Sequence, residues 1–115
     1  MDNQKIYLMN IDSLTMHKVG TTYRDVTVRA GELTSRKKAE HQPIAYITIN
    51  SESENRAKAV ETHTLATFEE NGLTVVGNDY IITDGISTDT ILKNFIKIAT
   101  DYLKFLNISY TITIL

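Results

Sequence analysis

Residues 73–83 read LTVVGNDYIIT and predict a β-hairpin. Two short apolar strands, 73–76 and 80–83, enclose Gly77-Asn78-Asp79, whose residue types tolerate the positive φ angles of a tight turn. An antiparallel pair of strands is therefore expected here, and the segments on either side can be assigned relative to it.

A strand and a helix are predicted before this hairpin. Residues 44–49 alternate between apolar and other side chains, as strands with one buried face do. Ser51 and Glu54 then have the spacing of a helix capping box, and Asn71-Gly72 has the composition of a helix C-terminus. The apolar stripe of this helix is narrow, so we expect it to lie on the surface.

A second helix and a last strand are predicted after the hairpin. Ser87 or Thr88 can cap the helix, which continues to about Asn107. Residues 108–114 then alternate strictly between apolar and hydroxyl side chains. We expect the apolar set to form one buried face: Ile108, Tyr110, Ile112 and Ile114.

The predicted fold class is α+β. Residues 44–115 give the order β-α-β-β-α-β, which is the split βαβ arrangement of a ferredoxin-like core. Residues 5–33 are expected to form an antiparallel β extension before that core, with strands at 5–11, 14–19 and 23–30. Residues 34–43 are expected to be a polar loop. A length of 115 residues suits one domain, 1–115.

Composition excludes several classes of protein. The chain has no cysteine, 42% hydrophobic and 23% charged residues, and a formal net charge of −2. Disulfide scaffolds, thiol nucleophiles and Cys-ligated zinc are excluded, and a nucleic-acid partner is not expected. No signal peptide and no apolar run near ~20 residues is visible, so we expect a cytoplasmic protein without a membrane partner.

Histidines and phosphate-binding motifs give no sign of an enzyme. His17, His41 and His63 have no spacing that would pair them as metal ligands, and we expect all three to be exposed and unrelated. Neither Gly-x-Gly-x-x-Gly, a Walker motif nor Gly-x-Ser-x-Gly is present. We therefore predict no catalytic residues and no cofactor.

Three aspartates flank the hairpin and the second helix. Asp79, Asp84 and Asp89 could together hold a hard cation such as Mg²⁺. However, Asp79 and Asp84 stand where turns favour aspartate, and Asp89 stands where a helix dipole favours it. Turn and helix chemistry explains all three, so no metal site is predicted.

The basic residues concentrate in one part of the chain. Arg36, Lys37 and Lys38 are consecutive, with Arg24 and Arg29 upstream. These five side chains are the candidate contact for an anionic partner, which could be an acidic protein surface or a phosphate. The alternative is a solvated loop.

The second helix carries a wide apolar arc. Apolar side chains cover roughly 180° of it, against the ~100° that packing on one sheet requires. Leu92, Ile96 and Leu103 form the excess edge. Either residues 1–33 cover this edge or another subunit does, and the second alternative predicts a homo-oligomer.

These observations together predict a non-enzymatic interaction module that self-associates and binds a protein partner. Phage-encoded inhibitors of bacterial defence systems are proteins of this general kind. The alternative is a binder of a nucleotide or other small anionic ligand, held in a dimer cleft by Arg24, Arg29 and the 36–38 loop. A third hypothesis, a small hydrolase, would require carboxylates such as Asp84 and Asp89 to converge.

Overall fold

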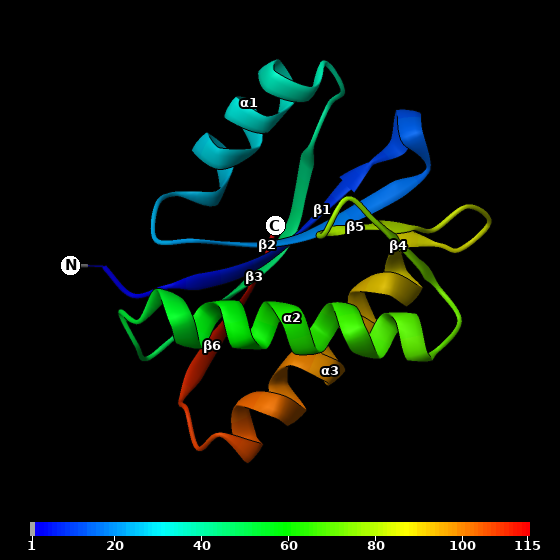
Figure 1. The fold of residues 1–115 in the computed structure, drawn as a ribbon. Coiled ribbons are helices and arrows are strands. Elements are labelled where there is room, and N and C mark those ends of the chain that lie inside the picture. The colour runs from blue at the N-terminus through cyan, green and yellow to red at the C-terminus, as the bar shows by residue number, and fades with distance from the viewer. Residues whose placement is uncertain (1) are drawn as a thin grey trace.

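The computed structural model describes residues 2–115, and over these residues the chain forms an α+β fold of three helices and a six-stranded antiparallel sheet (Figure 1). The strand order is β4-β5-β2-β1-β3-β6. The elements in chain order are β1 (Lys5–Ile11), a short 3₁₀ turn η1 (Asp12–Leu14), β2 (Met16–Thr22), α1 (Val26–Lys37), β3 (Gln42–Ile49), α2 (Glu54–Glu70), β4 (Thr74–Val76), β5 (Tyr80–Ile82), α3 (Thr88–Phe105) and β6 (Tyr110–Ile114).

The predicted class and the β-α-β-β-α-β order from β3 to β6 are confirmed, as is the hairpin of β4 and β5. The N-terminal extension is a hairpin of β1 and β2, and it lies in the middle of the sheet. It separates β3 from β5, which a ferredoxin-like core would place side by side. The first two strands described, β1 and β2, therefore occupy the two central positions of the sheet.

The predicted strand at 23–30 is wrong, because these residues begin α1. Asp25 caps this helix: its Oδ1 accepts hydrogen bonds from the backbone N–H groups of Thr27 and Val28, at 2.8 and 3.3 Å. The buried side chains of α1 are Val26, Ala30 and Leu33, which have helical spacing. The predicted loop is correspondingly shorter, since α1 continues to Lys37 and β3 begins at Gln42.

The sheet separates two hydrophobic cores. In Figure 1, α1 lies on one side of the sheet and α2 and α3 lie on the other. Strand β1 supplies both cores through its alternation: Ile6 and Leu8 pack towards α2 and α3, whereas Tyr7 and Met9 pack towards α1. Burial of both faces makes β1 apolar almost throughout, unlike a strand with one face in water.

Helix α2 lies on the surface as its narrow stripe predicts, since residues such as Arg56, Lys58 and Glu69 are exposed and one face alone is buried. Its N-cap is Ser53, whose Oγ accepts from the Arg56 N–H at 3.2 Å, so the predicted Ser51 capping box is wrong. The helix packs against α3 and the sheet, and it buries Val60, Thr64 and Phe68 completely or nearly so. The Thr64 hydroxyl donates a hydrogen bond to the Val60 carbonyl, and this bond allows a polar residue to be buried on this face.

Helix α3 uses its wide arc to contact both the sheet and α2. Leu103 is 0% exposed, while Leu92 and Ile96 are half-buried against the core. Of the two alternatives for this edge, coverage within the chain holds for Leu103, on a helix that contacts β1. Coverage of the remaining exposed parts of Leu92 and Ile96 by a second subunit stays a prediction. The exposed apolar residue of α3 is Phe105, at 81%.

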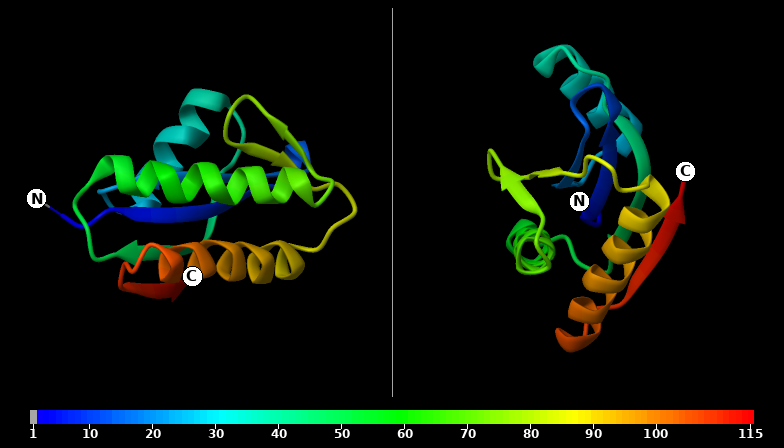
Figure 2. Two further views of the ribbon diagram at one scale, coloured as in Figure 1. Left: turned by 60° about the horizontal axis from the view of Figure 1, so that its bottom comes forward. Right: turned by 90° about the vertical axis from the view of Figure 1, so that its right-hand side faces the viewer.

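Strand β6 lies at the margin of the sheet, and its apolar face is only partly covered. Ile108 is buried as expected, but Ile112 is 38% exposed and Ile114 is 56% exposed. The prediction of one fully buried face is wrong for this strand. The reason is position: β6 is an edge strand paired only with β3, so no strand covers its outer side, and Figure 2 shows it at the margin of the sheet beside α3.

Candidate functional site

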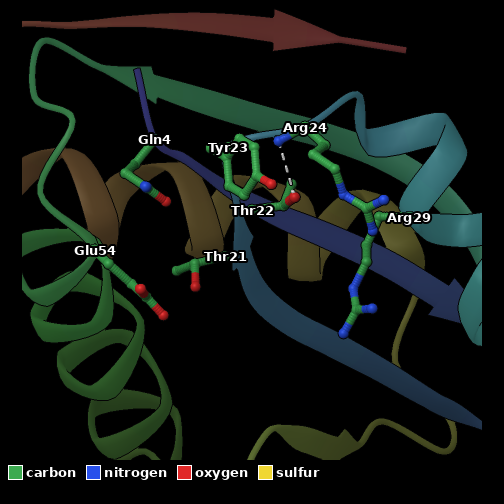
Figure 3. Close-up of a pocket in the computed structure, with 7 residues that line it drawn as sticks. All are labelled: Gln4, Thr21, Thr22, Tyr23, Arg24, Arg29 and Glu54. Carbon is green, nitrogen blue, oxygen red and sulfur yellow. Dashed lines mark hydrogen bonds between the residues drawn. The ribbon is translucent and has the colours of Figure 1, made fainter. Parts of the chain in front are cut away.

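Two hollows lie near the two ends of α1, and the predicted basic residues divide between them. The first, which we call the arginine hollow, has a volume of about 200 Å³ (Figure 3). Its lining residues come from the residue before β1, from β2, the β2–α1 connection, α1 and the start of α2: Gln4, Thr21, Thr22, Tyr23, Arg24, Arg29 and Glu54. The Arg24 N–H donates to the Thr22 Oγ1 at 3.0 Å, which fixes the chain where it leaves β2.

Carboxylates neutralise the two arginines of this hollow. Glu32 Oε1 accepts from Arg24 Nη2 at 2.5 Å and from Arg29 Nη1 at 3.3 Å. The Arg24 guanidinium, with a smaller contribution from Arg29, lowers the pKa of the Glu32 carboxyl. Glu54 adds a second carboxylate to the wall. An anionic ligand would therefore have to displace Glu32, so this geometry gives little support to a nucleotide site.

Beneath the arginine hollow, Arg29 also interacts with the hydroxyl of Tyr7. Tyr7 is buried, and burial raises its pKa to about 12 despite the neighbouring guanidinium. The phenol is therefore neutral at any ordinary pH. Arg29 thus interacts both with a buried residue under α1 and with Glu32 at the surface, so its charge already has a structural role.

The second hollow, which we call the apolar hollow, lies at the C-terminal end of α1 and has a volume of about 190 Å³. Three separate segments of the chain, 14–16, 37–41 and 76–80, line it: Leu14, Met16, Lys37, His41, Val76, Gly77 and Tyr80. Leu14 is 46% exposed and faces solvent at the β1–β2 turn. An open hollow with this lining offers contact to an apolar side chain.

Of the basic run Arg36, Lys37 and Lys38, Lys37 lines the apolar hollow and the other two adjoin it in the chain. All three side chains are exposed, and Lys38 ends α1 in the left-handed conformation with φ 54°. Within the part of the chain that the structure describes, no ion pair engages them. Their charges are free for a partner, unlike those of Arg24 and Arg29.

The polar wall of the apolar hollow is internally satisfied. His41 Nδ1 lies 2.7 Å from the Ala39 carbonyl, which can only accept, so this nitrogen carries the proton and Nε2 accepts from the Tyr80 hydroxyl at 2.8 Å. Burial lowers the pKa of His41, which favours this neutral form. Lys18 pairs with Asp79 and lies 4.8 Å from the centre of the Tyr80 ring. These contacts fix Tyr80, so the hollow is a preformed feature.

A third hollow, of about 250 Å³, surrounds His17 on the other side of the sheet. His17 Nδ1 lies 2.7 Å from Thr83 Oγ1 and its Nε2 lies 3.2 Å from Thr88 Oγ1. Burial lowers the pKa of His17 to about 4. The expectation of three exposed histidines is thus wrong, since His17 and His41 are each 3% exposed. For His17, the sequence does indicate burial, because His17 and the apolar Val19 are two residues apart and therefore share one face of the strand.

The three aspartates do not converge. Asp79 pairs with Lys18, Asp84 lines the hollow around His17, and Asp89 lies in the first turn of α3. Among residues 2–115, no group of three or more His, Asp or Glu side chains is placed to hold a metal ion. Nor is any helix within that range long and apolar enough to span a membrane.

Comparisons with known proteins add no constraint on function. No family model matches the chain, and it matches neither a curated protein nor a solved structure. The functional argument therefore depends on the geometry of the chain itself.

Proposed function

We propose that this chain is a non-enzymatic protein-binding module, and that its contact surface is the apolar hollow together with the basic rim of Arg36, Lys37 and Lys38. The observation that carries the proposal is that Lys37 lines a preformed apolar depression and stands in the chain between two further exposed cations. None of the three has a described ion-pair partner. The matching partner is a protein segment with one apolar anchor side chain and neighbouring Asp or Glu residues.

The energetics favour such a partner over a small anion. Burying one aliphatic or aromatic anchor contributes about 1.5–3 kcal/mol, whereas an exposed ion pair contributes about 0.2–1 kcal/mol. The anchor would therefore supply most of the affinity, and the cations would supply association rate and selectivity for acidic sequences. Arg24 and Arg29, the other candidates for a nucleotide, already share Glu32.

A random peptide library displayed on phage tests this proposal directly. We expect the wild-type protein to select peptides with an aromatic or aliphatic residue flanked by Asp or Glu. A Leu14→Asp variant should not select them, because it places a carboxylate in the wall of the hollow at a position that is already exposed. Selection of the same peptides by both proteins would contradict the proposed surface.

The basic rim is tested with a charge-matched pair of triple variants. Changing Arg36, Lys37 and Lys38 to Ser should weaken binding of a selected peptide and flatten its salt dependence, while the unfolding free energy changes by less than about 0.5 kcal/mol. The control changes three exposed cations of α2 and α3 to Ser: Arg56, Lys58 and Lys93. The control has the same net charge, so equal loss of binding in both variants would show that only overall charge matters.

A further inference from the structure

The two edges of the sheet differ in how they are protected from pairing with another chain. At one edge, β4 has only three residues, and a short strand gives little template for further pairing. At the other edge, β6 has five residues in regular register with β3. The β6 edge is the one that can accept another strand.

The hydrogen bonds to β3 show which backbone groups of β6 are directed outwards. The Leu115 N–H donates to the Ile44 carbonyl at 2.9 Å, and the Asn50 N–H donates to the Ser109 carbonyl at 2.8 Å. Because these directions alternate along an antiparallel strand, the backbone groups of Tyr110, Ile112 and Ile114 point away from the sheet. They form a continuous row of donors and acceptors along the edge.

The features by which proteins usually protect an edge strand are missing from β6. Residues 108–115 contain no charged residue and no proline, and the pairing of β6 with β3 is free of bulges. Ile112 and Ile114 are also substantially exposed beside this edge. A flat, uncharged edge with exposed aliphatic side chains is the type that pairs with another strand.

We propose that β6 pairs antiparallel with β6 of a second copy of this chain, about a two-fold axis through Ile112. This register places Ile112 opposite its own copy, Thr111 opposite Thr113 of the second copy, and Tyr110 opposite Ile114 of the second copy. The outward groups of Tyr110, Ile112 and Ile114 all find partners in it, and each pair exchanges both of its hydrogen bonds. One sheet then continues through both copies.

The second copy fits this edge because the edge is complementary to itself. Thr–Thr and aromatic–β-branched pairs are favourable cross-strand neighbours, and no charge is buried when they meet. A two-fold pairing of β6 with β6 also gives a closed dimer with no free pairing edge of this kind. Pairing β6 with β4 of another copy would instead give an open-ended chain of molecules, and each contact would be limited to three residues. Strand pairing alone falls below the ~1,200 Å² of a standard stable interface, so the dimer should dissociate in the micromolar range.

A charge-swap experiment tests the two-fold axis. Wild-type protein should show a concentration-dependent monomer–dimer equilibrium in analytical ultracentrifugation, up to several hundred micromolar. Ile112→Lys and Ile112→Glu should each raise the dissociation constant by about a hundredfold or more, because like charges then face each other at the axis. An equimolar mixture of the two variants should dimerise again. Failure of the mixture to associate would overturn the proposed register.

Two controls separate this surface from others. Phe105→Lys changes the most exposed apolar side chain of α3, and it should leave the dimer intact. Ile114→Lys, at a more exposed position than Ile112, provides a second disrupting variant if Ile112→Lys does not fold, with circular dichroism as the check on folding. A wild-type protein that stays monomeric, or a dimer lost only through Phe105→Lys, would overturn the proposal.

Amide hydrogen exchange gives an independent readout. The N–H groups of Thr111 and Thr113 are directed towards β3 and should be protected at every concentration. Those of Tyr110, Ile112 and Ile114 should gain protection only as the protein concentration rises. Uniform behaviour of all five amides would contradict strand pairing. This proposal does not depend on the protein-binding surface near α1, since the leucine and rim variants there leave β6 unchanged.

Discussion

The contact between Tyr7 and Gly20 fixes how β1 and β2 sit under α1. These residues are directly paired across the two strands, and the Tyr7 ring lies over Gly20. A Cβ atom at position 20 would overlap the ring and hydroxyl of Tyr7. The absence of a side chain at residue 20 is therefore what allows a buried tyrosine to reach Arg29.

Gly20→Ala should lower the unfolding free energy by about 2 kcal/mol, because an extra methyl group in a closed core forces its neighbours to move. The cost should largely vanish in a Tyr7→Leu background, which removes the ring. Gly31→Ala is the matched control, since no heavy atom lies within 4 Å of its added Cβ and it lies within α1; we expect it to stabilise the protein by about 0.5–1 kcal/mol. Chemical denaturation of the wild type, the three single variants and the double variant measures all these values, and equal effects at positions 20 and 31 would contradict the role of Tyr7.

His17 should make the protein less stable in mild acid. Its pKa falls from 6.5 to about 4 on burial, so between these pH values the unfolded chain binds a proton that the folded chain does not. The contribution of neutral His17 is complete above pH 6.5 and decreases as pH falls towards 4, by about 3 kcal/mol in total.

The measurement is the pH dependence of the unfolding free energy in wild type and in His17→Gln. The variant should flatten the slope between pH 4 and 6.5. An unchanged slope in His17→Gln would show that other groups cause the acid sensitivity.

At the scale of elements, helix α1 shows where two sequence patterns compete. Val26, Val28 and Ala30 alternate like a strand and include β-branched residues, and that pattern predicts β structure. Val26, Ala30 and Leu33 have helical spacing over a longer stretch, and Asp25 can cap a helix. The cap and the longer period prevail because the partner for this segment is a sheet face, not a neighbouring strand.

Asp25→Ala should therefore lower the unfolding free energy by about 1 kcal/mol, since it removes the acceptor for two N–H groups in the first turn of α1. Thr27→Ala serves as the control, because Thr27 is exposed and lies two residues after Asp25 in the first turn. It should change the unfolding free energy by less than about 0.5 kcal/mol. Thermal and chemical denaturation provide the comparison. A strand at 23–30 would show no difference between the two variants.

The elements with strong local signals could be predicted, and the candidate site only in part. Gly77-Asn78-Asp79 marks a tight turn through residues that need no tertiary context, and Ser87 was one of two expected caps for α3. The basic residues Arg36, Lys37 and Lys38 were found because they are consecutive. The apolar hollow, which Lys37 lines, combines three segments that are distant in sequence, so no local pattern could reveal it.

At the scale of the whole molecule, the insertion of β1 and β2 between β3 and β5 governs where stability is concentrated. Strand β1 is paired on both sides, and both of its faces are covered by helices. Strands β4 and β6 each have one unpaired side. Contact density therefore falls from the centre of the sheet to its edges.

Native-state hydrogen exchange should follow this gradient. The amides of β1 should exchange only through global unfolding, whereas those of β4 should exchange through smaller local openings with lower free energies. Monitoring by NMR at low denaturant separates the two regimes. Exchange of β1 amides at the rate of β4 amides would contradict the central role of the hairpin.

The central position of β1 also has a consequence for folding during synthesis. The β1–β2 hairpin leaves the ribosome before α2 and α3, yet both of its faces require partners that are translated later, including these two helices. Translation proceeds at about 5–20 residues per second, so the apolar faces of the hairpin and its unpaired outer edges stay exposed for several seconds. Nascent chains of this protein should therefore depend on a chaperone or on transient shielding by the ribosome more than a protein whose last strand is central.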